Sequence, residues 1–537
     1  MSQIPKNKNK KFGHKGISSI SSDPDLTKSE SLKPLEPFKK EDFNSLKNPL
    51  QKTDPNEAFS NFESQSEAAN ARFENSVSSN GAIDQAASGS ANKQNSNKKQ
   101  RSLKKDQLML KRDRWLARNG HNLTYVGIFL FTLVLYFRPY ETIPGLSGFS
   151  SIALIIAVAT LLAYVPTQFS LESSLTIFTI EIKCVIFLTL WAILTMPLAK
   201  DPGLAWKKFS EEYIKIVLIF IVMVNILRTQ ARIKGLMWLS IAVGIMLSYQ
   251  ALSLYYKGEF KVEGYRVNVE IGGMFGNPNN LAIHLVIFTP IVFMLGMASQ
   301  NKTAKLLYFI GAAMMVAGNM VTQSRGAFLG LVAVGAILVW KLSHRQRVKT
   351  ILVSSIVAIL IIVFAPGNYG LRILSIFDPS LDPVGSSNER MALLNQSIEV
   401  TLRNPFGIGF ANFPVVGLKN LETHNAYTQV SSELGWLALI AYLILLISPW
   451  RKLAAVERRM YAEKDFSWIY YSSIGVQASI AAYMISSFFG PVAYDWYVYY
   501  PIAYAVGLRR IYYLKQTAAE TNLLEKSNLI NFKTQKA

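Results

Sequence analysis

Apolar runs, each close to the length of a membrane-spanning helix, fill most of the chain after residue 121. A helix crosses the hydrocarbon core of a bilayer with about 20 apolar residues, because its own hydrogen bonds satisfy the backbone there. We count about twelve such runs from length and periodicity. Their predicted positions are 122–138, 149–165, 178–198, 213–227, 235–256, 279–298, 304–321, 326–342, 349–365, 432–449, 468–489 and 492–509. The pattern predicts an all-α integral membrane protein, with transmembrane helices one to nine in 122–365 and ten to twelve in 432–510.

The composition before the first run is different. Residues 1–121 are rich in Lys, Asn, Ser and Gln and have no sustained apolar period. Such a segment cannot bury enough apolar surface to offset the entropy of ordering it, so we expect a disordered tail. No apolar h-region of a signal peptide occurs between Met1 and Glu30. The basic end of the tail, KKQRSLKKDQLMLKRDRWLARNGH, is interpreted either as a contact with anionic membrane lipids or as a topology signal.

Basic residues are concentrated in this tail and in short loops between the apolar runs. The chain has 56 Lys and Arg against 35 Asp and Glu, a formal net charge of +21. With the tail inside, the loops RTQARIK, SQNKTAK, KLSHRQRVK and PWRKLAAVERRMYAEK all fall on the cytoplasmic side, as the positive-inside rule requires. An even number of spans then places both termini, including the tail 511–537, in the cytoplasm. No zinc-finger spacing or aromatic signature accompanies the charge, so we expect no nucleic-acid partner.

The other polar features fall on the opposite, extracytoplasmic face. They are the loop 257–278, the turn TQSRGA at 322–327, the turn 490–495 and the long loop 366–431 between the ninth and tenth spans.

Residues 386–403 of the long loop are predicted to form an amphipathic helix. Ser386 and Glu389 form a capping box at its start. Apolar residues recur along it at helical spacing: Met391, Leu394, Ile398 and Leu402. We expect this helix to lie on the membrane surface over the mouth of the bundle.

Four motifs on this face resemble a known family. They are SRGAFLGL, the GNPNNLA start of a span, NPFGIGFANF and the HNAYTQVSSELGWLAL entry into a span. Their order, their common face and the large loop between the ninth and tenth spans resemble the O-antigen ligase and O-antigen polymerase superfamily. The resemblance covers roughly residues 120–510 in topology.

This resemblance implies a metal-independent, inverting glycosyltransferase with no cofactor. Its donor would be a glycan linked to undecaprenyl diphosphate, and its active site would lie at the periplasmic face of a bacterial inner membrane. Negative charge accumulates on the diphosphate as the sugar leaves, and guanidinium groups suit that charge because they bind phosphate oxygens bidentately. The acceptor hydroxyl must lose a proton as it attacks, and a histidine near its ordinary pKa can take it.

Four residues match the family's functional positions. His424 matches its histidine and is the candidate general base; it can also be a helix-end histidine that only caps. Arg325 in SRGA matches the diphosphate-binding arginine, and the alternative is an interfacial anchor that reaches the headgroups. Arg266 matches a second family arginine, and Arg390 fits the family pattern at the start of the surface helix. Either can instead be an ordinary solvated charge.

Other polar residues rank below these four. His284, inside the sixth span, is interpreted as a core histidine bonded to a neighbouring helix. Glu433 either orients His424 or simply favours the start of its own helix. The segment Asn277–Asn280 either shapes the site or caps the sixth span. Cys184 is the only cysteine, which excludes disulfides and cysteine metal sites, and we predict no metal ligands.

The sequence leaves the acceptor open. The lipid A core is favoured, which would make the protein an O-antigen ligase, but the same motifs suit an O-antigen or exopolysaccharide polymerase or a protein O-oligosaccharyltransferase. A secondary transporter is the alternative from another class, and it predicts broken helices in repeated halves. The sequence shows no internal repeat, and its charged residues gather at one face.

Overall fold

The computed structural model describes residues 121–138, 152–172, 174–271, 275–363, 369–374 and 386–536. By internal contacts the chain divides into two units, Met1–Lys98 and Lys99–Ala537, and all described residues belong to the second. The predicted disordered tail therefore lies outside the described residues, except for His121, which begins a helix.

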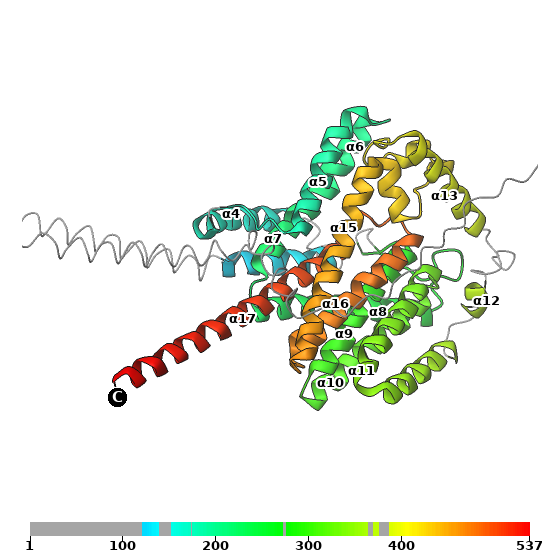
Figure 1. Cartoon of the computed structure of the whole chain (residues 1–537). Coiled ribbons are helices and arrows are strands. Elements are labelled where there is room, and N and C mark those ends of the chain that lie inside the picture. Colours follow the sequence, from blue (N-terminus) through cyan, green and yellow to red (C-terminus); the bar gives the residue numbers. More distant parts are fainter. Residues whose placement is uncertain are drawn as a thin grey trace, which may run out of the picture. The chain divides into compact units, whose positions relative to one another are not determined.

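The regular elements of the described residues are helices, joined by turns and one isolated bridge between Val262 and Arg266 (Figure 1). After the helix His121–Phe137 they are α4 (Ile152–Glu172), α5 (Ile180–Thr195), η4 (Met196–Leu198), α6 (Pro202–Lys208), η5 (Phe209–Tyr213), α7 (Ile214–Ile226), α8 (Gln230–Tyr256), α9 (Pro278–Ala298), α10 (Lys302–Val321), α11 (Arg325–Val363), α12 (Tyr369–Leu374), α13 (Ser386–Arg403), α14 (Phe413–Val416), η7 (Leu418–Asn420), α15 (Ala426–Ala462), α16 (Trp468–Ser486), η8 (Ser487–Phe489) and α17 (Trp496–Lys536). The predicted all-helical architecture is confirmed for this part of the chain.

Seven of these helices are long and apolar enough to cross a membrane. The spans are Ile152–Ser170, Ile180–Leu198, Gln230–Tyr256, Pro278–Ala298, Lys302–Val321, Arg325–Leu342 and Ala426–Ala462. Several apolar helices in one chain are the mark of a multi-pass membrane protein. The count of about twelve spans stays a prediction from hydropathy.

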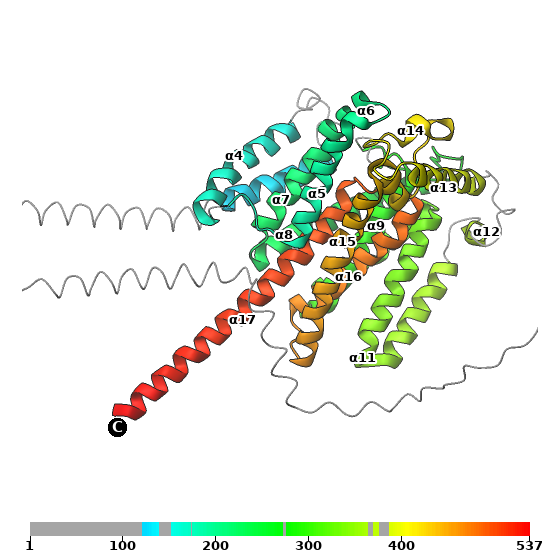
Figure 2. The ribbon, with the colours of Figure 1, turned by 45° about the horizontal axis from the view of Figure 1, so that its top comes forward.

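Several helices differ in extent from the predicted segments. The predicted span 213–227 corresponds to α7, which has only 13 residues and continues from α6 through the π-helical turn η5. The predicted span 326–342 and the described part of the predicted span 349–365, as far as Val363, belong to one helix, α11, whose ribbon bends back in Figure 2. The predicted cytoplasmic tail 511–537 is a continuation of α17 as far as Lys536.

Helix α9 is the most buried of the candidate spans. In its apolar window 83% of the residues are buried, against 22% in α4. It packs against α16, α10, α11 and α8, whose labels lie around it in Figure 1. The loop that enters α9 is therefore fixed within the bundle.

Helix α15 is interrupted near its start. Gly435 has φ 82° and ψ −176°, and the backbone of the loop 405–409 runs across the break. There the amides of Ile408 and Gly409 donate to the carbonyls of Ser432 and Glu433, over 3.0 and 2.9 Å. Because helix carbonyls freed inside a membrane protein must find other partners, this loop completes the helix.

Both glycines of the crossing are required by space. A Cβ at Gly435 would lie 2.2 Å from the carbonyl oxygen of Pro405, and a Cβ at Gly407 would lie 2.2 Å from that of Glu433. The motifs NPFGIGF and SSELGW therefore form one structural unit, which holds the first turns of α15 beside the long loop.

A buried carboxylate joins three helices at the other end of α15. Glu181, in the first turn of α5, is fully buried. Both of its oxygens accept from Arg509 of α17, over 3.1 and 3.3 Å. Ser448 and Lys452 of α15 lie 3.1 and 3.7 Å from the same carboxylate. Removing one partner of a buried pair leaves an uncompensated charge, which makes this cluster a stability determinant.

We predict that Glu181→Ala destabilises the protein by about 3–5 kcal/mol, because Arg509 loses its carboxylate. Thermal unfolding of the purified protein in detergent measures the change. Glu399→Ala is the matched control, since it removes a carboxylate paired with Arg403 at the surface, where both side chains are more than half exposed. A surface pair contributes about 0–1 kcal/mol. Equal effects of the two substitutions would contradict a structural role for the Glu181 cluster.

Candidate functional site

Arg266 is a buried arginine in the loop between α8 and α9. Its side chain is 2% exposed. Its Nε donates to the backbone carbonyl of Thr322 over 3.0 Å, and its Nη2 donates to Oδ1 of Asn279 over 2.7 Å. A carboxylate oxygen of Glu263 lies 3.4 Å from Nη1. Burial and these bonds distinguish Arg266 from a solvated loop charge.

Arg325 is the first residue of α11 and is also buried. The residue before it, Ser324, donates its hydroxyl to the same Oδ1 of Asn279, over 3.0 Å. Asn279 therefore connects Arg266 to the turn that carries Arg325. Burial lowers the pKa of the Arg266 guanidinium, Glu263 opposes this shift, and the like charge of Arg325 adds to it. Because the Nε of Arg266 donates to the carbonyl of Thr322, three residues before Arg325, both cations lie at the same turn, and their combined field favours an anion.

The first turns of α11 approach the end of α16 closely through two glycines. Gly326 and Gly330 form a GxxxG pattern, which lets helix backbones come together in membranes. A Cβ at Gly326 would lie 2.5 Å from Cβ of Phe489, and one at Gly330 would lie 2.1 Å from Oγ of Ser486. This packing fixes the position of Arg325, the neighbour of Gly326.

His424 lies directly before α15 with φ 53°, in the left-handed region that few side-chain-bearing residues adopt. Its neighbours hold the turn. Thr423 donates its hydroxyl to the carbonyl of Asn425 over 3.0 Å, and Oδ1 of Asn425 accepts from the backbone amides of Tyr427 and Thr428. Asn425 therefore caps α15, and the half-buried imidazole of His424 is not needed for that purpose.

Charged residues at the start of α13 lie near His424. Glu389 accepts from Lys419 over 2.8 Å, and Arg390 follows it in the helix. Burial lowers the pKa of His424 below 6.5, Arg390 lowers this pKa further, and Glu389 opposes the shift. The neutral imidazole, which can accept a proton, is therefore the favoured form at pH 7.

The turn η8 contacts the starts of both site helices. Tyr427, in the first turn of α15, donates its hydroxyl to the carbonyl of Met484 over 2.6 Å, and its ring lies 5.1 Å from that of Phe488. The next residue, Phe489, is the one that faces Gly326 of α11.

Through this shared turn, the structure places the four sequence-predicted residues at one end of the bundle. They form two pairs, Arg266 with Arg325 and Arg390 with His424. Arg266 and Arg325 are far apart in the sequence, and Arg390 and His424 come from different parts of the long loop 366–431.

The predicted amphipathic helix is present as α13, with the expected bounds Ser386–Arg403. Its buried side chains are Leu393, Ser397 and Thr401, and the Thr401 hydroxyl lies 3.0 Å from that of Ser431 in α15. Of the predicted apolar stripe, Met391, Ile398 and Leu402 are exposed. The helix thus packs through Leu393, which clusters with Ile408 and Phe413, and through Ser397 and Thr401, while three of the four residues of the predicted apolar stripe stay exposed.

Two lower-ranked interpretations need correction. Glu433 does not bond to His424: its carboxylate accepts from the backbone amides of Ala411 and Phe413, over 3.1 and 3.3 Å, and so anchors the NPFGIGFANF segment. His284 is a core residue, but both ring nitrogens are buried with no hydrogen-bond partner among the described residues. It packs among aromatic rings instead, those of Tyr136, Phe275, Phe288 and Tyr497.

Asn277 and Asn279 have different roles. Asn277 caps α9, as one of its two interpretations predicted, by accepting from the backbone amide of Asn279 over 2.8 Å. Asn279 is the bridge between Arg266 and Ser324, and its place in the polar run Asn277–Asn280 was the only signal for that role.

Tyr369 is a candidate that sequence reasoning missed. It begins the short helix α12, is 1% exposed and lies close enough to Arg266 for the guanidinium to affect the pKa of its hydroxyl, which burial raises. That hydroxyl is buried without a hydrogen-bond partner in the described part of the chain. No pattern in the sequence around it marks this position. Among the same residues, no group of three His, Cys, Asp or Glu side chains is arranged to hold a metal ion.

The fold and these contacts define a class: an all-helical, multi-pass membrane protein with two buried arginines at one end, one in the α8–α9 loop and one at the start of α11. Residues 310–443 match the family described as O-antigen ligase, a stretch that includes Arg325, Arg390 and His424 and begins after Arg266. The match confirms the resemblance to the O-antigen ligase superfamily that the motifs predicted. No curated protein matches the chain. The family supports an enzyme of the O-antigen ligase or polymerase type.

We predict that Gly326→Ala destabilises the protein by about 1–3 kcal/mol, because the new methyl group has no room beside Phe489. Gly335→Ala in the same helix is the matched control, since a Cβ there meets nothing within 4 Å. Alanine is the better helix former, so the control should be neutral or slightly stabilising. Thermal unfolding in detergent compares the two variants. A Gly326→Ala protein as stable as the control would show that the approach of α11 to η8 is not tight.

Proposed function

We propose that this protein is an O-antigen ligase-like glycosyltransferase that moves a glycan from undecaprenyl diphosphate to an acceptor hydroxyl at the periplasmic face of the inner membrane. The observation that carries the proposal is the pairing of two buried arginines, Arg266 and Arg325, at the end of the bundle that also holds His424. Buried cations in a membrane protein are costly and are retained where they serve a function.

The arginine pair is proposed to bind the diphosphate of the donor. Fixed guanidinium groups keep their charge and present planar, bidentate donors to phosphate oxygens. Asn279 and the carbonyl of Thr322 hold the Arg266 side chain in place, so little reorganisation is needed when the ligand arrives. The Tyr369 hydroxyl, buried near Arg266, is proposed as a further donor to the same oxygens.

The transfer itself is proposed as a single displacement. The acceptor oxygen bonds to the anomeric carbon from the face opposite the diphosphate, while His424 takes the hydroxyl proton. The bond from the anomeric carbon to the diphosphate oxygen breaks, and its electron pair stays on the diphosphate beside Arg266 and Arg325. The configuration at the anomeric carbon is inverted. In this scheme the guanidinium groups supply the positive charge, with no metal ion or cofactor.

Arg390 and α13 are proposed to act on the acceptor side. Arg390 adds to the effect of burial in favouring the neutral form of His424, and we propose that it also contacts an acidic group of the acceptor. The exposed stripe of Met391, Ile398 and Leu402 suits a helix lying in the membrane surface, where a lipid-anchored acceptor arrives. The lipid A core is the favoured acceptor, and a growing polysaccharide or a protein is the alternative.

Arg325 is expected to recognise the diphosphate by geometry as well as by charge. Arg325→Lys should be clearly impaired and Arg325→Ala more so, by roughly a hundred- to a thousand-fold in rate. The measurement is the initial rate of transfer from a lipid-diphosphate donor in vesicles, at matched protein level. Lysine reaches the headgroups as well as arginine does, so full activity of Arg325→Lys would assign the residue to interfacial anchoring.

The lowered pKa of His424 predicts how the transfer rate depends on pH. Because its pKa lies below 6.5, the transfer rate should be constant around pH 7 and fall only as the pH drops through that lowered value. Arg390→Gln removes a positive charge, so it should raise this pKa and move the acid limb to higher pH by about one unit or less. Arg403→Gln, at the exposed end of the same helix, is the control and should leave the limb in place.

His424→Ala should abolish transfer, and normal transfer by this variant would exclude His424 as the base.

A further inference from the structure

A second polar site lies at the other end of the candidate span Arg325–Leu342, near the middle of α11. Trp340 and Lys341 are in the last turn of the candidate span Arg325–Leu342. Sixteen residues of helix separate Lys341 from Arg325, a rise of roughly 24 Å. In the topology predicted from the sequence, this places Trp340 and Lys341 at the depth of the headgroups on the face where the basic loops gather, far from the proposed transfer site.

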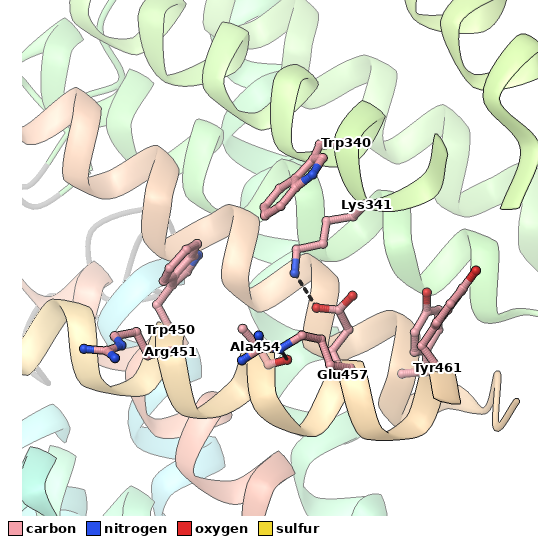
Figure 3. A pocket seen from close by; sticks show the side chains of 9 residues that line it. Trp340, Lys341, Trp450, Arg451, Ala454, Glu457 and Tyr461 are labelled. Carbon is pink, nitrogen blue, oxygen red and sulfur yellow. Dashed lines mark hydrogen bonds and ion pairs between the residues drawn. The ribbon is translucent and has the colours of Figure 1, made fainter. Parts of the chain in front are cut away.

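At this depth a pocket of about 530 Å³ opens between α11, α15 and α16 (Figure 3). It is lined by Trp340, Lys341, Trp450, Arg451, Ala454, Glu457, Arg458, Tyr461 and Tyr470. Aromatic rings with a polar edge beside basic side chains are the combination found where membrane helices meet the headgroup layer.

A buried ion pair forms part of the pocket wall. Lys341 of α11 bonds to Glu457 of α15, as Figure 3 shows, and each side chain is 8% exposed. Gln477 of α16 donates to the same carboxylate over 3.4 Å, and the Lys341 ammonium lies 5.0 Å from the centroid of the Trp340 ring. These contacts fix the three helices around the pocket.

The charge of the pocket favours an anion. Lys341 and Glu457 neutralise each other, whereas Arg451 and Arg458 of α15 are exposed at the rim, so the lining has a net charge of +2. A guanidinium at the membrane surface binds phosphate bidentately. Trp340 is 55% exposed, which leaves an aromatic surface beside the pocket for acyl chains. The basic tail of this chain has the same sign of charge and is a poor occupant.

We propose that this pocket binds the phosphate headgroup of an anionic glycerophospholipid from the leaflet at that face. Basic pockets between helices on the cytoplasmic side suit such headgroups. Arg451 and Arg458 bind the phosphate, the Lys341–Glu457 pair holds the wall, and Trp340 packs along the start of an acyl chain. The proposal does not depend on the glycan chemistry at the opposite end.

Native mass spectrometry of the purified, delipidated full-length protein tests this. The probes are phosphatidylglycerol and phosphatidylcholine with identical acyl chains. The wild-type protein should retain phosphatidylglycerol in preference. The double variant Arg451→Gln, Arg458→Gln should lose at least about tenfold in this binding, since two charge-assisted hydrogen bonds are removed. Its binding of phosphatidylcholine should not change. Equal retention of the two lipids by the wild-type protein would overturn the proposal.

The matched control is the double variant Lys302→Gln, Lys305→Gln. It removes two positive charges at the same end of the bundle, at the start of α10 and outside the pocket. It should bind phosphatidylglycerol as the wild type does, and an equal loss would assign the preference to general surface charge.

If the arginine variant does not fold, Trp340→Leu keeps the charge and should weaken lipid retention several-fold. Displacement of the lipid by millimolar inorganic phosphate would instead identify a site for the soluble anion.

Discussion

The side chain of Arg266 connects the loops on which the candidate site depends. It reaches from the α8–α9 loop to the carbonyl of Thr322 and to Asn279 at the start of α9. Asn279 in turn receives the hydroxyl of Ser324, the residue before Arg325. Because α9 is the most buried candidate span, this network fixes the arginine pair to the centre of one end of the bundle.

The histidine side of the site depends on a different constraint, the need of buried backbone groups for partners. Helix α15 is broken at Gly435, and the loop 405–409 supplies the missing hydrogen bonds. Trp191 of α5 donates its indole N–H to the carbonyl of Leu434, the residue before Gly435, over 2.8 Å. The loop, α5 and the first turns of α15 are therefore one packed unit, and His424 is held at its edge.

The sequence predicted the features that local physics determines. The capping box and the helical spacing predicted the bounds of α13, and the apolar runs that follow Arg325 and His424 predicted that both lie where helices start. It could not predict contacts between distant segments: Asn279 as a bridge, Tyr369 near Arg266, or the carboxylate of Glu433 bound to the loop amides. Nor does hydropathy distinguish a short helix such as α7, extended through a π-turn, from a full span.

The central claim is that Arg266 and Arg325 form the diphosphate site and that His424 faces the same space. A cryo-EM structure of the full-length protein with undecaprenyl diphosphate tests it most directly. We expect both phosphates within hydrogen-bonding distance of the two guanidinium groups, with the His424 imidazole facing the same bound ligand. A diphosphate bound elsewhere, with Arg266 and Arg325 still joined only to protein groups, would contradict this account.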